Sequence, residues 1–189
     1  MSPHSPFANA TSNAERILVI YTGGTIGMQQ YADGLAPSGD FALRMAAALT
    51  QLSPAQQRAL PLYDILSYST LIDSSAATPL TWQHLAHDIN NQLAAYTGFV
   101  IIHGTDTLSW TAASLAYQLQ GLDRPVVLTG AMQPLEASGG DGLAQRLVTA
   151  RLKSRPVLTV IGVVFARHPA CHGFGQHRLK GFAWVQCFG

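Results

Sequence analysis

Short apolar segments alternate along this chain with segments whose apolar residues recur at helical spacing. The apolar segments predict five strands, at residues 16–21, 62–68, 98–103, 125–129 and 156–165. The intervening segments predict helices at residues 39–52, 81–95, 107–120 and 143–152. This alternation predicts an α/β fold, a three-layer sandwich built on a mainly parallel sheet.

Local signals support three of the helices. The first should bury its apolar positions, which are Phe41, Leu43, Met45, Leu49 and Leu52. Thr78 and Pro79 form a start signal for the second helix, and Gly121 forms a stop signal for the third.

Composition divides the chain into three parts. Residues 1–15 are polar and predict a disordered leader, residues 16–166 form the α/β domain, and residues 167–189 form an irregular basic tail. All ten acidic residues precede the segment that follows Asp141, and that segment holds seven of the eleven Lys and Arg residues. The formal net charge of +1 and the lack of a long apolar run argue against nucleic-acid or membrane partners, so we expect a cytoplasmic enzyme.

Three strand ends carry small polar residues, and ligands of parallel α/β sheets bind at such ends. The first is Thr22-Gly23-Gly24-Thr25-Ile26-Gly27, which follows the first strand. A phosphate-binding loop and a purely structural turn are the alternatives. The loop has neither the lysine of a Walker motif nor the spacing of a dinucleotide fingerprint.

The second strand end is His103-Gly104-Thr105-Asp106-Thr107. A hydroxyl beside a carboxylate can orient a water or an amide and hold an ammonium group, but the same residues can also cap the next helix. His103 is expected to be a packed residue and is left out of the catalytic set. The third strand end is Asp73-Ser74-Ser75, which can bind an amino-acid head group or form an ordinary turn.

Three motifs in this order resemble the bacterial asparaginase/glutaminase family. They are YTGGTIGM at residues 21–28, GFVIIHGTDTL at residues 98–108 and RPVVLTGAMQP at residues 124–134. The Asp73–Ser75 turn is similar to the substrate-binding turn of the cytoplasmic type I branch. Order and spacing agree from about residue 17 to residue 141.

The resemblance implies a role for each site residue. Thr25 would be the nucleophile that attacks the side-chain amide of L-asparagine and forms an acyl-enzyme, releasing ammonia and then L-aspartate. Thr105 would assist proton transfer and position the water, and Asp106 would bind the α-ammonium group. Asp73, Ser74 and Ser75 would hold the head group. The family implies no metal and no cofactor, and its members are commonly homo-oligomers.

Two departures from the family pattern qualify this assignment. Leu35 stands where the family often carries a tyrosine in the loop after the nucleophile, with Tyr31 nearby. The family's later catalytic lysine has no clear counterpart, because Lys180 is differently placed and is not assigned. From about Arg167 the sequence leaves the family pattern, which we interpret as a frameshift, and the second, smaller domain is expected to be missing.

The sequence also allows other functions. They are an inactive truncated remnant of the enzyme, a related amidase subunit, and a nucleotide binder that uses the 22–27 loop. The tail also holds potential zinc ligands at His168, Cys171, His172, His177 and Cys187, but their spacing does not fit the usual paired ligands. Its basic and aromatic residues allow nucleic-acid binding as a further alternative.

Overall fold

The computed structural model describes residues 16–138 and 161–165 of the chain. Several predicted segments lie outside these residues: the leader 1–15, the helix 143–152, the first part of the last strand at 156–160, and the tail 167–189 with Lys180 and the candidate zinc ligands. Within the described residues, no helix is long and apolar enough to cross a membrane.

A five-stranded parallel sheet forms the centre of the fold, with the strand order β4-β1-β5-β6-β7. The strands are β1 (Arg16–Tyr21), β4 (Leu62–Ser67), β5 (Gly98–Ile102), β6 (Val126–Ala131) and β7 (Ile161–Phe165). All five predicted strands are therefore present. The predicted parallel α/β architecture is confirmed.

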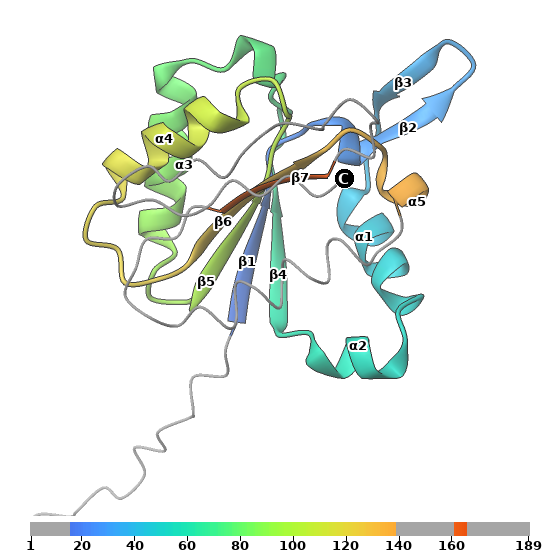
Figure 1. Ribbon diagram of the computed structural model, residues 1–189, viewed down its shortest axis with the longest axis horizontal. Coiled ribbons are helices and arrows are strands. Elements are labelled where there is room, and N and C mark those ends of the chain that lie inside the picture. Colours follow the sequence, from blue (N-terminus) through green and yellow to red (C-terminus); the bar gives the residue numbers. More distant parts are fainter. Residues whose placement is uncertain (1–15, 139–160, 166–189) are drawn as a thin grey trace, which may run out of the picture.

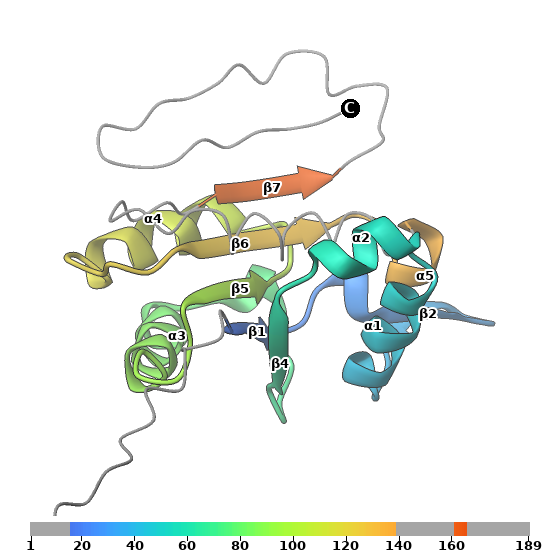
Figure 2. The ribbon, with the colours of Figure 1, turned by 90° about the horizontal axis from the view of Figure 1, so that it is seen from below.

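Helices cover both faces of this sheet and complete the three layers (Figure 1). On one side lie α1 (Phe41–Thr50), α2 (Pro54–Ala59) and the short α5 (Leu135–Ser138), and on the other lie α3 (Pro79–Asn91) and α4 (Leu108–Gln118). Figure 2 gives the same separation from below. The predicted start signal of α3 is confirmed, because the helix begins at Pro79 and the backbone N–H of Thr78 donates to Oγ1 of Thr81 at 3.1 Å.

The strands divide their side chains between two hydrophobic clusters. Val19 and Ile102 pack on the α1 side of the sheet, whereas Ile20 and Ile101 pack on the side of α3 and α4. Successive side chains of a strand point to opposite faces, and both faces of this sheet are covered. This accounts for the continuous apolar runs that predicted these strands.

The expected core position of Leu43 in α1 is wrong. Its side chain is 70% exposed, whereas Phe41, Met45 and Leu49 are buried. Those three residues are four apart and form one helical face, and Leu43 lies about 200° around the helix from Phe41 at 3.6 residues per turn.

A hairpin and two helices were not predicted from the sequence. An antiparallel hairpin of β2 (Met28–Tyr31) and β3 (Gly34–Pro37) leaves the body of the fold just after the first loop (Figure 1). Helix α2 starts with a capping box in which Ser53 and Gln56 bond each other's backbone N–H. Helix α5 lies within the segment after residue 129 that has the composition of a loop.

The strand order places a topological switch point between β1 and β5. From β1 the chain runs through α1 to β4 on one flank, and from β5 it runs through α4 to β6 on the other. The helices that follow these two neighbouring strands, α1 and α4, therefore pack on opposite faces of the sheet, and a crevice forms where the two connections part. Ligands of open α/β sheets bind in such a crevice.

Candidate functional site

A cleft of about 370 Å³ lies at the carboxyl ends of β1, β4 and β5. Its polar lining consists of Thr25, Asp73, Ser74, Thr105 and Asp106, and its apolar lining includes Tyr21, Met28, Pro37, Leu71, Ile72 and Met132. Five of the six predicted site residues therefore face the same cleft. The sixth, Ser75, does not line it.

The loop after β1 is shaped by two glycines with positive φ. Gly23 has φ 134° and Gly24 has φ 91°, conformations that other residues rarely adopt. The loop is tied down by Thr22, whose hydroxyl donates to the carbonyl of Ile102 at 2.9 Å. Thr25 then opens a three-residue 3₁₀ turn, Thr25–Gly27, which carries its side chain to the cleft.

The loops after β1 and β5 touch through their glycines. A Cβ atom on Gly24 would lie 2.8 Å from the backbone nitrogen of Gly104. On Gly104, such an atom would overlap the side chain of Ser74. The glycines therefore allow the three loops to converge, which brings Thr25 close to the motif that carries Thr105 and Asp106.

The hydroxyl of Thr105 and the carboxylate of Asp106 are only lightly engaged. Thr105 Oγ1 donates to the sulfur of Met132 at 3.3 Å, a weak acceptor that a water or substrate can replace. Asp106 is exposed; its Oδ2 accepts from the hydroxyl of Ser74 at 3.2 Å, and its Oδ1 has no hydrogen-bond partner in the described part of the chain.

The alternative that a side chain of this motif caps the next helix is wrong. The N-cap of α4 is Thr107, and it makes no side-chain cap hydrogen bond. Its hydroxyl instead donates to the carbonyl of Ser74 at 2.8 Å. Thr107 therefore joins the β5 loop to the Asp73–Ser75 turn, and Asp106 is left to face the cleft.

The turn that carries Asp73 stabilises its ionised carboxylate. Its Oδ1 accepts from the hydroxyl of Ser75 at 2.8 Å and from the backbone N–H of Ser75 at 2.9 Å. These hydrogen bonds, the hydroxyl first, lower the pKa of Asp73. Ser75 is therefore placed to orient Asp73, and the buried Ser74 is placed to orient Asp106.

The cleft is electronegative. Asp73 and Asp106 both face it, and no Lys or Arg is among the described residues that line it. Such a cleft attracts an ammonium group and repels a phosphate, which argues against the nucleotide-binding alternative. A zwitterion would have to place its carboxylate against neutral donors such as hydroxyls and backbone N–H groups.

His103 is a packed residue, as the sequence predicts. It is 1% exposed, its Nδ1 pairs with the carbonyl of Gly104 at 2.7 Å, and its Nε2 pairs with the hydroxyl of Thr111 at 3.3 Å. The carbonyl of Gly104 can only accept, so the proton of the neutral ring is on Nδ1, and Nε2 accepts from the Thr111 hydroxyl, which in turn accepts the indole N–H of Trp82. Burial lowers the pKa of His103, and the bond to Gly104 opposes this only in part.

This burial makes stability depend on pH. Because the folded pKa of His103 lies below its unfolded value, the unfolded chain takes up a proton that the folded chain does not when pH falls below about 6.5. The free energy of unfolding should therefore be lower at about pH 5.5 than at about pH 7.5. Urea unfolding of His103→Gln should give a smaller difference between the two pH values. The exposed His87→Gln is the matched control, and an equal flattening there would contradict the assignment.

Two residues singled out in the sequence lie away from the cleft. Leu35 and Tyr31 are in the β2–β3 hairpin, 43% and 49% exposed, and neither lines the cleft. Tyr31 therefore does not replace the family's tyrosine in this structure. The hairpin contributes Met28 and Pro37 to the cleft instead.

Sequence reasoning missed the apolar half of the cleft. Tyr21 stacks on Phe41 with ring centroids 4.0 Å apart, and burial raises the pKa of Tyr21 although the charge of Arg44 opposes it. Met132 follows β6, so the rule that ligands bind at strand ends would have included it. Arg44, which binds the end of the Thr25 turn, carried no signal in the sequence because it lies within a helix remote from every motif.

The fold and the site define the class of doubly wound α/β domains that carry a ligand cleft at their switch point. Within that class the chain belongs to the asparaginase family, because the family model for the asparaginase N-terminal domain matches residues 16–173. This agrees with the resemblance of its sequence motifs. No cluster of three or more potential metal ligands is found among the described residues.

Known proteins support this membership. The chain is 42% identical over 126 residues to L-asparaginase 1 of Escherichia coli (strain K12), covering 67% of this chain and 36% of that protein. It is 28% identical over 151 residues to a glutamyl-tRNA(Gln) amidotransferase subunit of Pyrococcus horikoshii, covering 78% of this chain and 33% of that protein. The crystal structure of L-asparaginase I from Vibrio cholerae superposes with a TM-score of 0.65 at 35% identity, covering 76% of this chain and 44% of that one. The chain thus spans between a third and a half of the length of these proteins.

Proposed function

We propose that residues 16–166 form the N-terminal domain of an L-asparaginase, which hydrolyses L-asparagine to L-aspartate and ammonia. The observation that carries this proposal is that Thr25, Thr105 and Asp106 line one electronegative cleft at the switch point. The identity to L-asparaginase 1 of Escherichia coli supports the choice of substrate.

The proposed reaction starts at the hydroxyl of Thr25. Its oxygen attacks the side-chain amide carbon of asparagine, and the C–N bond breaks as a proton passes to the leaving nitrogen, releasing ammonia. Water then attacks the resulting ester, returns the proton to Thr25 and releases aspartate. Thr105 positions this water and relays the proton, and backbone N–H groups near Thr105 stabilise the oxyanion.

The carboxylates bind the substrate rather than react with it. Asp106 receives the α-ammonium group, and its Oδ1, which no described residue hydrogen-bonds, is available for this contact. Asp73, kept ionised by Ser75, lies in the same cleft and strengthens this attraction. Ser74 orients Asp106, and the turn that carries it offers neutral donors to the substrate carboxylate.

The remaining proposals concern the setting of the enzyme. We place it in the cytoplasm, with L-asparagine as its partner, in a homo-oligomer, and without nucleic-acid, membrane, metal or cofactor partners. A related amidase subunit is the second candidate function, supported by the identity to the amidotransferase subunit of Pyrococcus horikoshii. An inactive remnant of the enzyme is the third.

Ammonia release by the purified chain separates these three. We expect release from L-asparagine, with Asp106→Asn raising KM at least about tenfold because the ammonium loses its charged partner. Asp123→Asn is the matched control, since it makes the same change at an exposed carboxylate beside Arg124, away from the cleft. Release from L-glutamine in preference to L-asparagine would favour the amidase subunit. A folded chain that releases no ammonia from either would be a remnant.

A further inference from the structure

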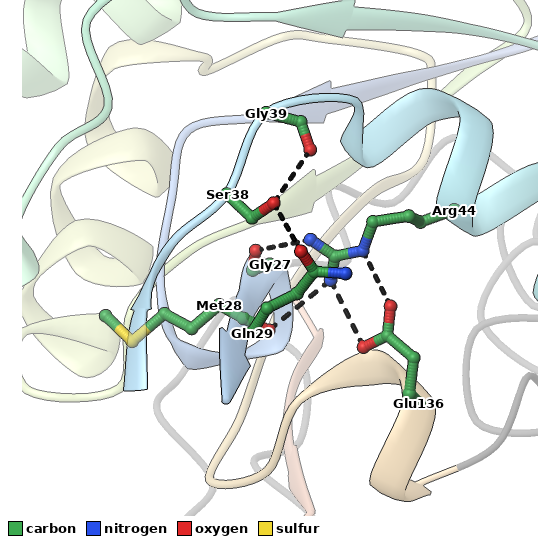
Figure 3. A network of polar contacts seen from close by, with 7 residues as sticks. All are labelled: Gly27, Met28, Gln29, Ser38, Gly39, Arg44 and Glu136. Atoms are coloured by element: carbon green, nitrogen blue, oxygen red, sulfur yellow. Dashed lines mark hydrogen bonds and ion pairs between the residues drawn. The ribbon is translucent and has the colours of Figure 1, made fainter. Parts of the chain in front are cut away.

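The side chain of Arg44 is the centre of a polar network that contacts Gly27 and Met28, at the end of the turn that starts at Thr25 (Figure 3). It extends from α1 and is 13% exposed. Its Nε and Nη2 atoms donate to the two carboxylate oxygens of Glu136 at 2.6 and 3.2 Å. Its other contacts are the backbone carbonyls of Gly27, at 2.8 Å, and of Met28, at 3.4 Å.

These carbonyls terminate the turn that carries Thr25. The turn spans only Thr25–Gly27, and it is closed by the N–H of Gly27 donating to Gly24 and the N–H of Met28 donating to Thr25. A single 3₁₀ turn has poor hydrogen-bond geometry and little stability of its own. Contacts from outside must therefore hold Thr25 in one orientation.

Glu136 allows a largely buried arginine to bind the carbonyls of this turn. A largely buried guanidinium needs a counter-charge, and the planar fork can satisfy a carboxylate and two carbonyls at once. Burial disfavours the charged form of Glu136, but the hydrogen bonds and charge of Arg44 outweigh burial and lower the pKa of Glu136. Next to this ion pair, the hydroxyl of Ser38 donates to the side chain of Gln29, in the hairpin, at 2.6 Å (Figure 3).

The network also reaches the other half of the site. Glu136 belongs to α5, in the segment after β6. Four residues earlier in that segment, the sulfur of Met132 accepts the hydroxyl of Thr105. One segment therefore contacts the turn of Thr25 through Arg44 and contacts Thr105 through Met132.

We propose that Arg44 and Glu136 form a clamp that fixes the Thr25 turn against the segment after β6, and that Arg44 is therefore a positioning residue for the nucleophile. The clamp consists of contacts within the fold and does not depend on the proposed activity. Its effect on catalysis rests on the function proposed above.

Site-resolved amide hydrogen exchange tests the clamp without requiring activity. In Arg44→Met, the amides of Gly27 and Met28 should exchange about tenfold faster than in the parent, because a charged hydrogen-bond donor to the turn is lost. Amides of β5 should keep their parent rates. Arg58→Met, on the exposed face of α2, is the matched control and should change neither set.

Two further variants keep the test decisive if Arg44→Met fails to fold. Glu136→Gln preserves the shape of the partner and should speed exchange at the same two amides several-fold, and Arg44→Lys should do so to a similar degree because it loses the fork. Unchanged rates at Gly27 and Met28, or an equal rise in β5, would overturn the clamp.

An activity measurement tests the catalytic consequence separately. Arg44→Met should lower kcat for ammonia release about tenfold or more with KM within about twofold of the parent, because the substrate contacts remain while the nucleophile is misplaced. A rise in KM alone would contradict a positioning role. If the parent releases no ammonia, the proposed function fails, and the exchange rates still decide whether the clamp exists.

Discussion

Thr25→Ala should lower the rate of ammonia release from L-asparagine about 10³-fold or more and leave the urea unfolding midpoint unchanged. Loss of the nucleophile removes the only route to the proposed acyl-enzyme, and such losses in hydrolases with a covalent intermediate are of this size. Stability should not change, because the Thr25 hydroxyl makes no hydrogen bond within residues 16–138 and 161–165, and its removal leaves no buried group there unpaired.

The other threonine of the same loop provides the control. Thr22 is fully buried, and its hydroxyl is bonded to Ile102. Thr22→Ala should therefore reduce the free energy of unfolding by about 1–2 kcal/mol and still allow hydrolysis at a temperature where the chain is folded. If Thr25→Ala retained the parent rate, the proposed mechanism would be wrong.

Gly24→Ala should destabilise the fold by about 3 kcal/mol or more. Two costs combine at this position. The residue has φ 91° and ψ 168°, a region that is nearly restricted to glycine. The added Cβ would also lie 2.8 Å from the backbone of Gly104, which cannot move without separating the loops.

Two glycines outside the site separate these costs. Gly34 has φ 122° but open space around it, so Gly34→Ala should carry only the conformational cost, about 1–2 kcal/mol. Gly39 has open space and no positive φ, so Gly39→Ala should be neutral or slightly stabilising. Urea midpoints in the order Gly24→Ala, Gly34→Ala, Gly39→Ala, lowest first, would confirm the account. A Gly24→Ala midpoint equal to that of Gly34→Ala would show that the contact with Gly104 is not a constraint.

Most of the fold could be predicted because both faces of the sheet are buried. A strand such as β5 must then be apolar throughout, and its run GFVII is evident in the sequence. The hairpin of β2 and β3 escaped prediction for the opposite reason. It packs little, its strands are half exposed or exposed, and no burial pattern is imposed on its residues.

The polar half of the cleft could be predicted because parallel strands bring their carboxyl ends to one edge. That rule, with the family resemblance, was sufficient to select Thr25, Asp73 and Asp106. The rule could not predict which side chains hydrogen-bond each other. The bond from Ser74 to Asp106, and the reach of Arg44 to the Thr25 turn, depend on the angle at which loops approach each other, which pairwise spacing in a sequence does not encode.

The pairing of β1 with β5 has a consequence for the chain during its synthesis. The hydroxyl of Thr22 bonds to a carbonyl 80 residues further along, and the Gly24–Gly104 contact spans the same interval. The first loop therefore leaves the ribosome long before the strand that completes its surroundings. Until β5 docks, Thr25 is an ordinary hydroxyl without Thr105 or Asp106 beside it. If Thr25 is the nucleophile, as proposed above, reactivity toward amides should appear only when long-range folding is complete, and the nascent chain should expose no activated hydroxyl.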